Sequence, residues 1–161
     1  MFLIKAEYTE QLEVKTGIER AREFFTEWRN FVELMPGIES IRTEASGLLR
    51  WTVRTDVPTL GSMRAAFAVE LTDNRPDRVE WSPATIERKN YLRYAASFVE
   101  RGASQTLVRI TQHVELRRQH ARELHFLAGL VGENRISAEM QKRVAEMIKT
   151  FLERARAKLE G

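Results

Sequence analysis

Hydrophobic and polar residues alternate over the first part of the chain. Over residues 3–15, five apolar side chains share one parity: Ile4, Ala6, Tyr8, Leu12 and Val14. Successive side chains of a strand point to opposite faces, so this period of two predicts a long strand with one buried face. Glu10 departs from the pattern, because it is a carboxylate on the apolar parity.

A helical pattern follows this strand. Thr16, with Glu19 three residues later, has the form of a capping box and predicts a helix start. We expect the helix to continue to Leu34, broken into two short pieces near Trp28–Asn30. Pro36 and the glycine after it should end it.

Strand spacing returns between residues 38 and 116, where we expect about six strands joined by short turns. Such short connections imply an antiparallel meander. The side chains expected to face inward share the apolar parity of their strands: Leu49, Trp51, Val53, Thr55, Val57, Met63, Ala65, Phe67, Val69, Leu71, Val79, Trp81, Leu92, Tyr94, Ala96, Phe98, Val108, Ile110, Val114 and Leu116. Gln112 lies on this parity although it is polar.

The C-terminal part predicts one long amphipathic helix, with Ser137 as its cap. Its apolar residues recur at steps of three and four: Met140, Val144, Met147, Ile148, Phe151, Ala155 and Leu159. This stripe extends over about six turns of ~3.6 residues each. Residues 118–136 predict a short helix with Leu124, Leu127 and Leu130.

The order of elements predicts an α+β fold. We expect a curved antiparallel sheet of about seven strands in a helix-grip arrangement. Two short helices follow the first strand, and the long C-terminal helix crosses the concave face. A twisted sheet curls as it is covered, and a helix across its hollow side tends to leave a cavity. The 161 residues suit one domain.

These features resemble a known family, the START-like (SRPBCC) superfamily. It includes polyketide cyclase/dehydrase-like proteins and the G-type subunits of carbon monoxide dehydrogenase. The resemblance rests on the element order, on the segment Phe31–Ile41 with its Met-Pro-Gly-Ile junction, and on Gly61–Phe67 at the start of a middle strand. It covers nearly the whole chain and implies a single START-like ligand-binding domain over residues 1–161. It leaves ligand and chemistry open, because this scaffold carries many functions.

The candidate site is an apolar pocket between sheet and helix. The expected lining residues of the sheet are Tyr8, Trp51, Val53, Phe67, Trp81, Tyr94 and Phe98. Those of the helix are Met140, Val144, Met147 and Phe151. Apolar walls are typical of small-molecule sites, and methionine adapts to irregular ligands. The same side chains would also suit a solid core, and the resemblance favours the cavity.

Glu10 and Gln112 are the polar candidates for this pocket. In the START-like fold the first and last strands pair, and this pairing would place both side chains on the inner face of the sheet. An inward carboxylate needs a partner such as a ligand hydroxyl, Tyr8 or Tyr94. A strand bulge or a position at the rim would instead leave Glu10 in solvent.

Three functions fit these observations. The first is binding or transport of a small hydrophobic molecule, lipid-like or aromatic. The second is a polyketide cyclase/dehydratase-like enzyme that uses Glu10 as its acid/base group with help from Tyr94. The third is an accessory protein that docks on a membrane or a larger enzyme through basic residues within 117–158.

The composition of the chain narrows the choice of function. The chain has no cysteine, which excludes disulfides and thiolate metal sites and is compatible with a cytoplasmic location. Its formal net charge of +3 is too small to indicate nucleic-acid binding. The three histidines, His113, His120 and His125, lack the spacing of a metal site. We therefore expect no metal and no cofactor.

Overall fold

The computed structural model describes residues 1–161, and its elements follow the predicted order. The strands are β1 (Phe2–Val14), β2 (Ile38–Thr43), β3 (Leu49–Val57), β4 (Gly61–Arg75), β5 (Arg78–Pro83), β6 (Asn90–Gly102) and β7 (Gln105–Arg118). The helices are α1 (Ile18–Thr26), α2 (Trp28–Leu34), α3 (Ala128–Val131) and α4 (Glu133–Glu160). Short 3-10 turns occupy Ala45–Gly47 and Ala121–Glu123. None of the helices has the length and apolar character needed to cross a membrane.

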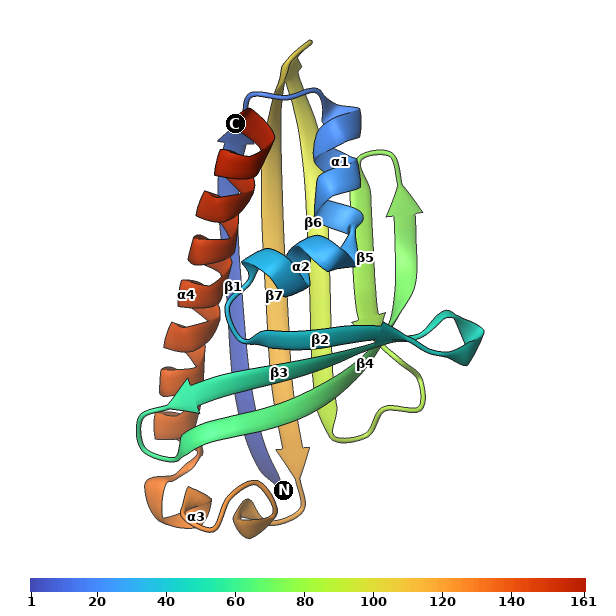
Figure 1. Ribbon diagram of the computed structural model, residues 1–161. Coiled ribbons are helices and arrows are strands. Elements are labelled where there is room, and N and C mark those ends of the chain that lie inside the picture. The colour runs from blue at the N-terminus through green and yellow to red at the C-terminus, as the bar shows by residue number, and fades with distance from the viewer.

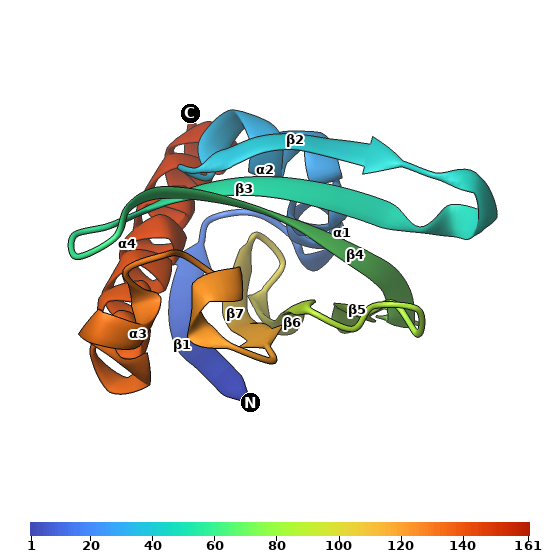
Figure 2. The same cartoon turned by 90° about the horizontal axis from the view of Figure 1, so that it is seen from below.

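The seven strands form one antiparallel sheet in the order β1-β7-β6-β5-β4-β3-β2. The sheet curls, so that β2, β3 and β4 run across the direction of β1, β7 and β6 (Figure 1). Seen from below, the two halves of the sheet face each other, and α4 closes the open side between β1 and β3 (Figure 2). The expected helix-grip arrangement is confirmed, and the apolar stripe of α4 is buried throughout.

Side chains of α4 seal the free edge of β1. Three backbone N–H groups of β1 each donate to one α4 side chain, in the pairs Leu3 to Glu133 (2.7 Å), Lys5 to Ser137 (3.1 Å) and Glu7 to Gln141 (2.8 Å). Two strand residues rise about 6.7 Å and four helix residues about 6 Å, so every second strand residue meets every fourth helix residue. The helix thereby occupies an edge that would otherwise be free to pair with another strand.

We expect Gln141→Ala to lower the free energy of unfolding by about 0.5–1.5 kcal/mol. Gln141 makes two bonds to β1, because its Nε2 also donates to the Glu7 carbonyl at 2.5 Å. Lys142→Ala is the matched control, because Lys142 is an exposed neighbour with no hydrogen-bond or ion-pair partner. Both variants gain similar helix propensity, so the comparison isolates the edge bonds. Equal urea midpoints for the two variants would show that the bonds from Gln141 to β1 do not stabilise the protein.

Both predicted helix caps are wrong. The helix α1 begins at Ile18 after Gly17, without a side-chain cap, and buried Thr16 instead offers its carbonyl to the Thr106 hydroxyl at 2.8 Å. The helix α4 begins one turn before Ser137, whose hydroxyl accepts the β1 bond described above. For Ser137, a bond from its hydroxyl to a distant strand replaces the expected local cap. The break between α1 and α2 falls at Glu27, just before the expected position.

The short helices place two phenylalanines on the sheet. Phe31 of α2 packs against three rings, with centroid distances of 4.9 Å to Tyr94, 5.4 Å to Trp51 and 5.4 Å to Phe151. Phe25 of α1 meets Phe151 edge to face at 5.8 Å. All five side chains are buried. This aromatic cluster fills the part of the hollow that lies under α1 and α2.

Candidate functional site

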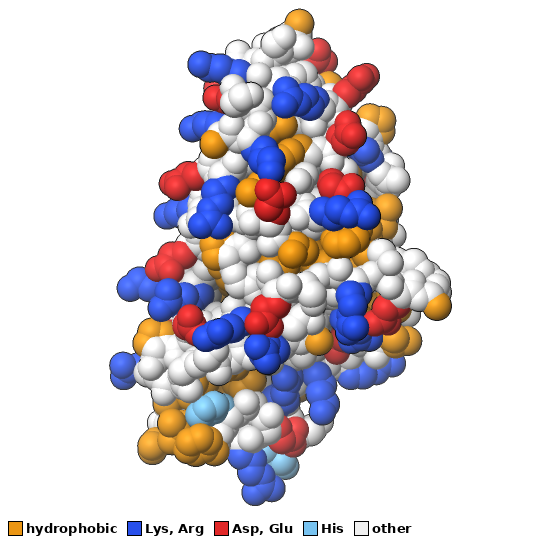
Figure 3. Space-filling view, in the orientation of Figure 1, with side chains coloured by type: hydrophobic (Ala, Val, Ile, Leu, Met, Phe, Trp, Pro, Cys, Tyr) orange, Lys and Arg blue, Asp and Glu red, His pale blue; other side chains and the backbone are white.

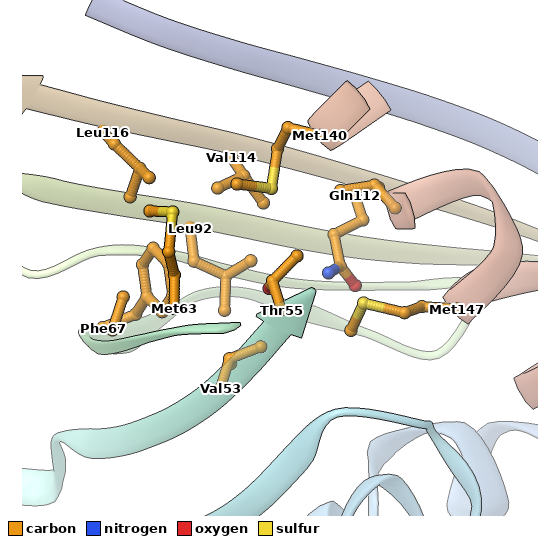
Figure 4. A pocket seen from close by; sticks show the side chains of 12 residues that line it. Val53, Thr55, Met63, Phe67, Leu92, Gln112, Val114, Leu116, Met140 and Met147 are labelled. Carbon is orange, nitrogen blue, oxygen red and sulfur yellow. The ribbon is translucent and has the colours of Figure 1, made fainter. Parts of the chain in front are cut away.

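An apolar cavity remains in the part of the hollow that the aromatic cluster does not fill. Ten of its twelve lining residues are hydrophobic. The lining residues are Val53, Thr55, Met63, Ala65, Phe67, Leu92, Gln112, Val114, Leu116, Met140, Val144 and Met147 (Figure 4). They come from β3 and β4 on one side, β6 and β7 on the other, and α4 at the open edge. The cavity therefore forms only where both halves of the sheet and the helix meet.

Gln112 supplies an unpartnered polar group to this cavity. The side chain is 3% exposed, and its Oε1 is buried without a hydrogen-bond donor. Figure 4 shows its amide between Thr55 and Met147, directed into the cavity. A buried acceptor without a partner costs about 1–3 kcal/mol. The arrangement is thus unfavourable for an empty core and suited to a molecule that donates a hydrogen bond.

The cavity reaches the surface along the first half of β4. β5 pairs with β4 only from Val69 onward, so the stretch Gly61–Phe67 has no neighbouring strand on that side. Thr55, Met63 and Ala65 are partly exposed here, whereas most of the remaining lining is buried. This stretch forms the mouth of the cavity.

The empty space inside the cavity is small, about 30 Å³. That is enough for one or two waters and far below the roughly 300–1,000 Å³ typical of drug-sized ligand sites. Three methionines, Met63, Met140 and Met147, take up room at the wall. Methionine has three rotatable side-chain bonds and repacks at low cost. A ligand would therefore take the place of these side chains.

The structure brings six of the predicted site residues to the cavity. They are Val53, Phe67, Gln112, Met140, Val144 and Met147. Four others pack in or against the aromatic cluster instead: Trp51, Tyr94, Phe98 and Phe151. Trp81 is partly buried on β5, outside the cavity lining. These aromatic side chains, which were expected at the pocket, pack instead against Phe25 of α1 and Phe31 of α2.

Glu10 and Tyr8 form a pair on β1, outside the cavity lining. The Tyr8 hydroxyl donates to Glu10, and the Lys149 ammonium lies 5.6 Å from the centroid of the Tyr8 ring. The hydrogen bond to Glu10, together with burial, raises the pKa of Tyr8 to about 12. Both side chains are partly exposed, because β1 is an edge strand. Glu10 thus bonds to a tyrosine, as predicted, but it does not line the cavity.

Tyr94 is buried away from the cavity lining. Its hydroxyl donates to the Phe25 carbonyl oxygen at 3.2 Å, and burial raises its pKa well above the ordinary tyrosine value. The hydroxyl therefore ties α1 to β6. The structure does not bring Glu10 and Tyr94 together as an acid/base pair.

Six cavity residues were not among the predicted site residues. They are Thr55, Met63, Ala65, Leu92, Val114 and Leu116. All lie on the inward parity of their strands, which is the signal that could have found them. None of the twelve lining side chains titrates near neutral pH. No three His, Cys, Asp or Glu side chains gather where a metal ion could bind.

Solved structures with this architecture include aromatase/cyclases. The aromatase/cyclase Zhui from a Streptomyces species superposes with a TM-score of 0.69 at 12% identity, over 97% of this chain and 94% of that one. The di-domain aromatase/cyclase BexL gives 0.66 at 14% identity, over 98% of this chain and 51% of that one. A START superfamily protein from Mycobacterium smegmatis gives 0.52 at 15% identity, over 86% and 96%.

These similarities establish the fold. The chain has the START-like, polyketide cyclase-like fold, as its element order and junction segments predicted. No family model matches the sequence, and no curated protein matches it either. At such low identities the superpositions carry no information about ligand or reaction, so the function has to be argued from the cavity itself.

Proposed function

We propose that the protein binds a small, mainly apolar molecule that carries one hydrogen-bond donor, held in the cavity between the sheet and α4. The observation that carries the proposal is the buried, unpartnered Oε1 of Gln112 in an otherwise apolar wall. A binding site of this type combines apolar contact area with a few polar groups that orient the ligand. Thr55 is the second polar group of the cavity and lies nearer the mouth.

Binding is favoured over acid/base catalysis by the chemistry of the lining. A general acid or base must lie within hydrogen-bond reach of the reacting group. The polar groups of the cavity are an amide and a hydroxyl, neither of which exchanges protons readily near neutral pH. The cyclase/dehydratase alternative has no acid or base group in the cavity to support it, and the likeness to aromatase/cyclases concerns the fold alone.

A matched pair of aromatic probes tests the proposal. We expect the protein to bind a naphthol about tenfold more tightly than the methylnaphthalene with a methyl group in place of the hydroxyl. The hydroxyl donates to Gln112, whereas the methyl group leaves Oε1 unpaired. Tryptophan fluorescence titration measures both dissociation constants, and native mass spectrometry shows whether the probe stays bound.

Gln112→Leu should remove this preference, since leucine presents no acceptor. Gln11→Leu is the control, because Gln11 lies on the exposed face of β1. The proposal fails if neither probe binds the wild-type protein. It also fails if Gln112→Leu keeps the preference for the naphthol.

The same substitution should stabilise the empty protein. Gln112→Leu replaces a buried amide that lacks a partner with an apolar group of similar size, so we expect a gain of about 1 kcal/mol in the free energy of unfolding. Chemical denaturation without ligand measures it. A loss of more than about 1 kcal/mol would show that the amide is satisfied in solution and has no need of a ligand.

A further inference from the structure

The segment between β7 and α4 has two different faces. We call residues 119–132, which include α3, the tip segment. Leu124, Leu127 and Val131 turn inward and pack against the core. Phe126 and Leu130 point outward and are 82% and 87% exposed, more than any other large apolar side chain of the chain. Leu130 lies within the short helix α3.

Three of the six exposed large apolar side chains, Met1, Phe126 and Leu130, lie at one end of the molecule. The tip segment lies at the lower end in Figure 1, beside the N-terminus, and Figure 3 shows a hydrophobic knob there. Met1 is 74% exposed and borders the same surface hollow as Glu123 of the tip segment. A group of exposed apolar side chains is typical of a surface that contacts another molecule.

Basic side chains lie at the same end of the molecule. Arg88, Lys89 and Arg118 border the hollow beside Met1, while Arg122 lies in the tip segment and Arg135 just after it. None of these five side chains forms an ion pair with a carboxylate. Of the acidic side chains nearby, Glu123 of the tip segment has no hydrogen-bond or ion-pair partner, and three others are engaged. Glu133 accepts from the backbone of β1, Glu115 pairs with Arg117, and Glu87 accepts from three backbone N–H groups.

Three basic side chains near the C-terminal end of α4 make contacts within the protein. Arg154 donates to the Leu34 carbonyl at 3.0 Å and Arg156 to the Glu13 carbonyl at 3.1 Å, while Lys158 pairs with Glu33. At the end of the molecule that carries the tip segment, basic side chains without a carboxylate partner lie together with exposed apolar side chains. That combination is complementary to an anionic lipid surface, with an apolar interior beneath negative headgroups.

The tip segment also lies next to the cavity. It joins β7, whose Leu116 lines the cavity, to α4, whose Met140 lines it from the other side. The mouth opens along the first half of β4, and Figure 1 shows the tip segment below this strand. A surface bound at the tip end would face the mouth.

We propose that the tip end of the protein docks on an anionic phospholipid bilayer, with Phe126 and Leu130 inserted among the lipids and Arg88, Lys89, Arg118, Arg122 and Arg135 at the headgroups. Docking in this orientation turns the mouth of the cavity to the membrane. The inference goes beyond ligand binding and does not depend on it, because the surface is formed without a ligand.

Vesicle co-sedimentation tests the docking. We expect the protein to bind vesicles of phosphatidylcholine mixed with phosphatidylglycerol, and to bind pure phosphatidylcholine vesicles much more weakly. The double variant Phe126→Asp with Leu130→Asp should lose affinity for the mixed vesicles by about tenfold or more, because two apolar groups no longer insert. Added salt should weaken wild-type binding, because the headgroup contacts are electrostatic.

Two control variants separate the tip end from general charge and apolar effects. Val99→Asp changes a 50% exposed apolar residue in the half of β6 near its hairpin with β7, at the opposite end of the sheet. Arg101→Glu reverses a charge in that hairpin and is compared with Arg122→Glu. We expect the Val99 and Arg101 variants to bind like the wild type and Arg122→Glu to bind several-fold more weakly.

The docking proposal is overturned by any of three results. The first is a wild-type protein that does not bind the mixed vesicles. The second is a double Asp variant that binds as well as the wild type. The third is a dimer in solution that the double variant dissociates, which would assign the apolar groups to a second copy of this chain. The naphthol titration is performed without vesicles, so failure of docking and failure of ligand binding are distinguishable.

Discussion

Phe151→Ala is expected to lower the free energy of unfolding by about 3–5 kcal/mol, a large share of the stability of a domain this size. Phe151 is fully buried at the contact of α4 with α1 and α2, and its ring meets Phe31 at 5.4 Å and Phe25 at 5.8 Å. The substitution removes these contacts and leaves a void that a rigid sheet cannot close. Urea unfolding followed by circular dichroism measures the loss.

The matched control is the same substitution at an exposed position. Phe126→Ala removes a ring that is 82% exposed, so its effect on stability should stay within about 0.5 kcal/mol. Similar losses for the two variants would contradict the aromatic cluster as the main packing unit between the helices and the sheet. A small loss at Phe151 alone would mean that the neighbouring rings refill the space.

Gly37→Ala is expected to cost about 2–3 kcal/mol, from backbone conformation and steric conflict together. Gly37 connects α2 to β2 with φ +88°, a left-handed conformation that favours glycine. Its carbonyl also accepts from the Arg54 N–H of β3 at 2.8 Å. A Cβ at this position would lie 2.6 Å from the Arg54 carbonyl oxygen, closer than such atoms approach.

Gly61→Ala separates the two contributions. Gly61 has the same φ of +88°, but a Cβ there would meet no atom within 4 Å. The Gly61 variant should therefore lose only the conformational part, about 1 kcal/mol. Thermal unfolding of both variants measures the difference. If the two substitutions cost the same, the close approach of Gly37 to β3 is absent in solution.

The elements of the fold were readable from the sequence because periodicity is a local property. Alternation identified β1 and the inner faces of β3, β4, β6 and β7, and the steps of three and four in α4 identified its buried stripe. Local signals failed where a distant partner competed. Ser137 looks like a helix cap, but its hydroxyl accepts a hydrogen bond from β1, far away in the sequence.

Gln112 and Glu10, the two polar residues on inward parities, show how much of the site side-chain alternation can predict. Gln112 lies on β7, which has a neighbouring strand on each side, so its inward side chain is enclosed in the cavity. Glu10 lies on β1 at the edge of the sheet, where water and Tyr8 can reach it. Both residues lie on the inward parity of their strands. Only the position of each strand in the sheet decides whether the side chain is enclosed.

The sequence by itself determined which segments are strands and helices and which side of each is apolar, because both follow from the spacing of neighbouring residues. Only the tertiary structure decided which part of the hollow is filled. That depends on where α1 and α2 place Phe25 and Phe31 against residues far away in the chain. The cavity, its unpartnered Gln112 and the exposed tip are what remain after those distant contacts have formed.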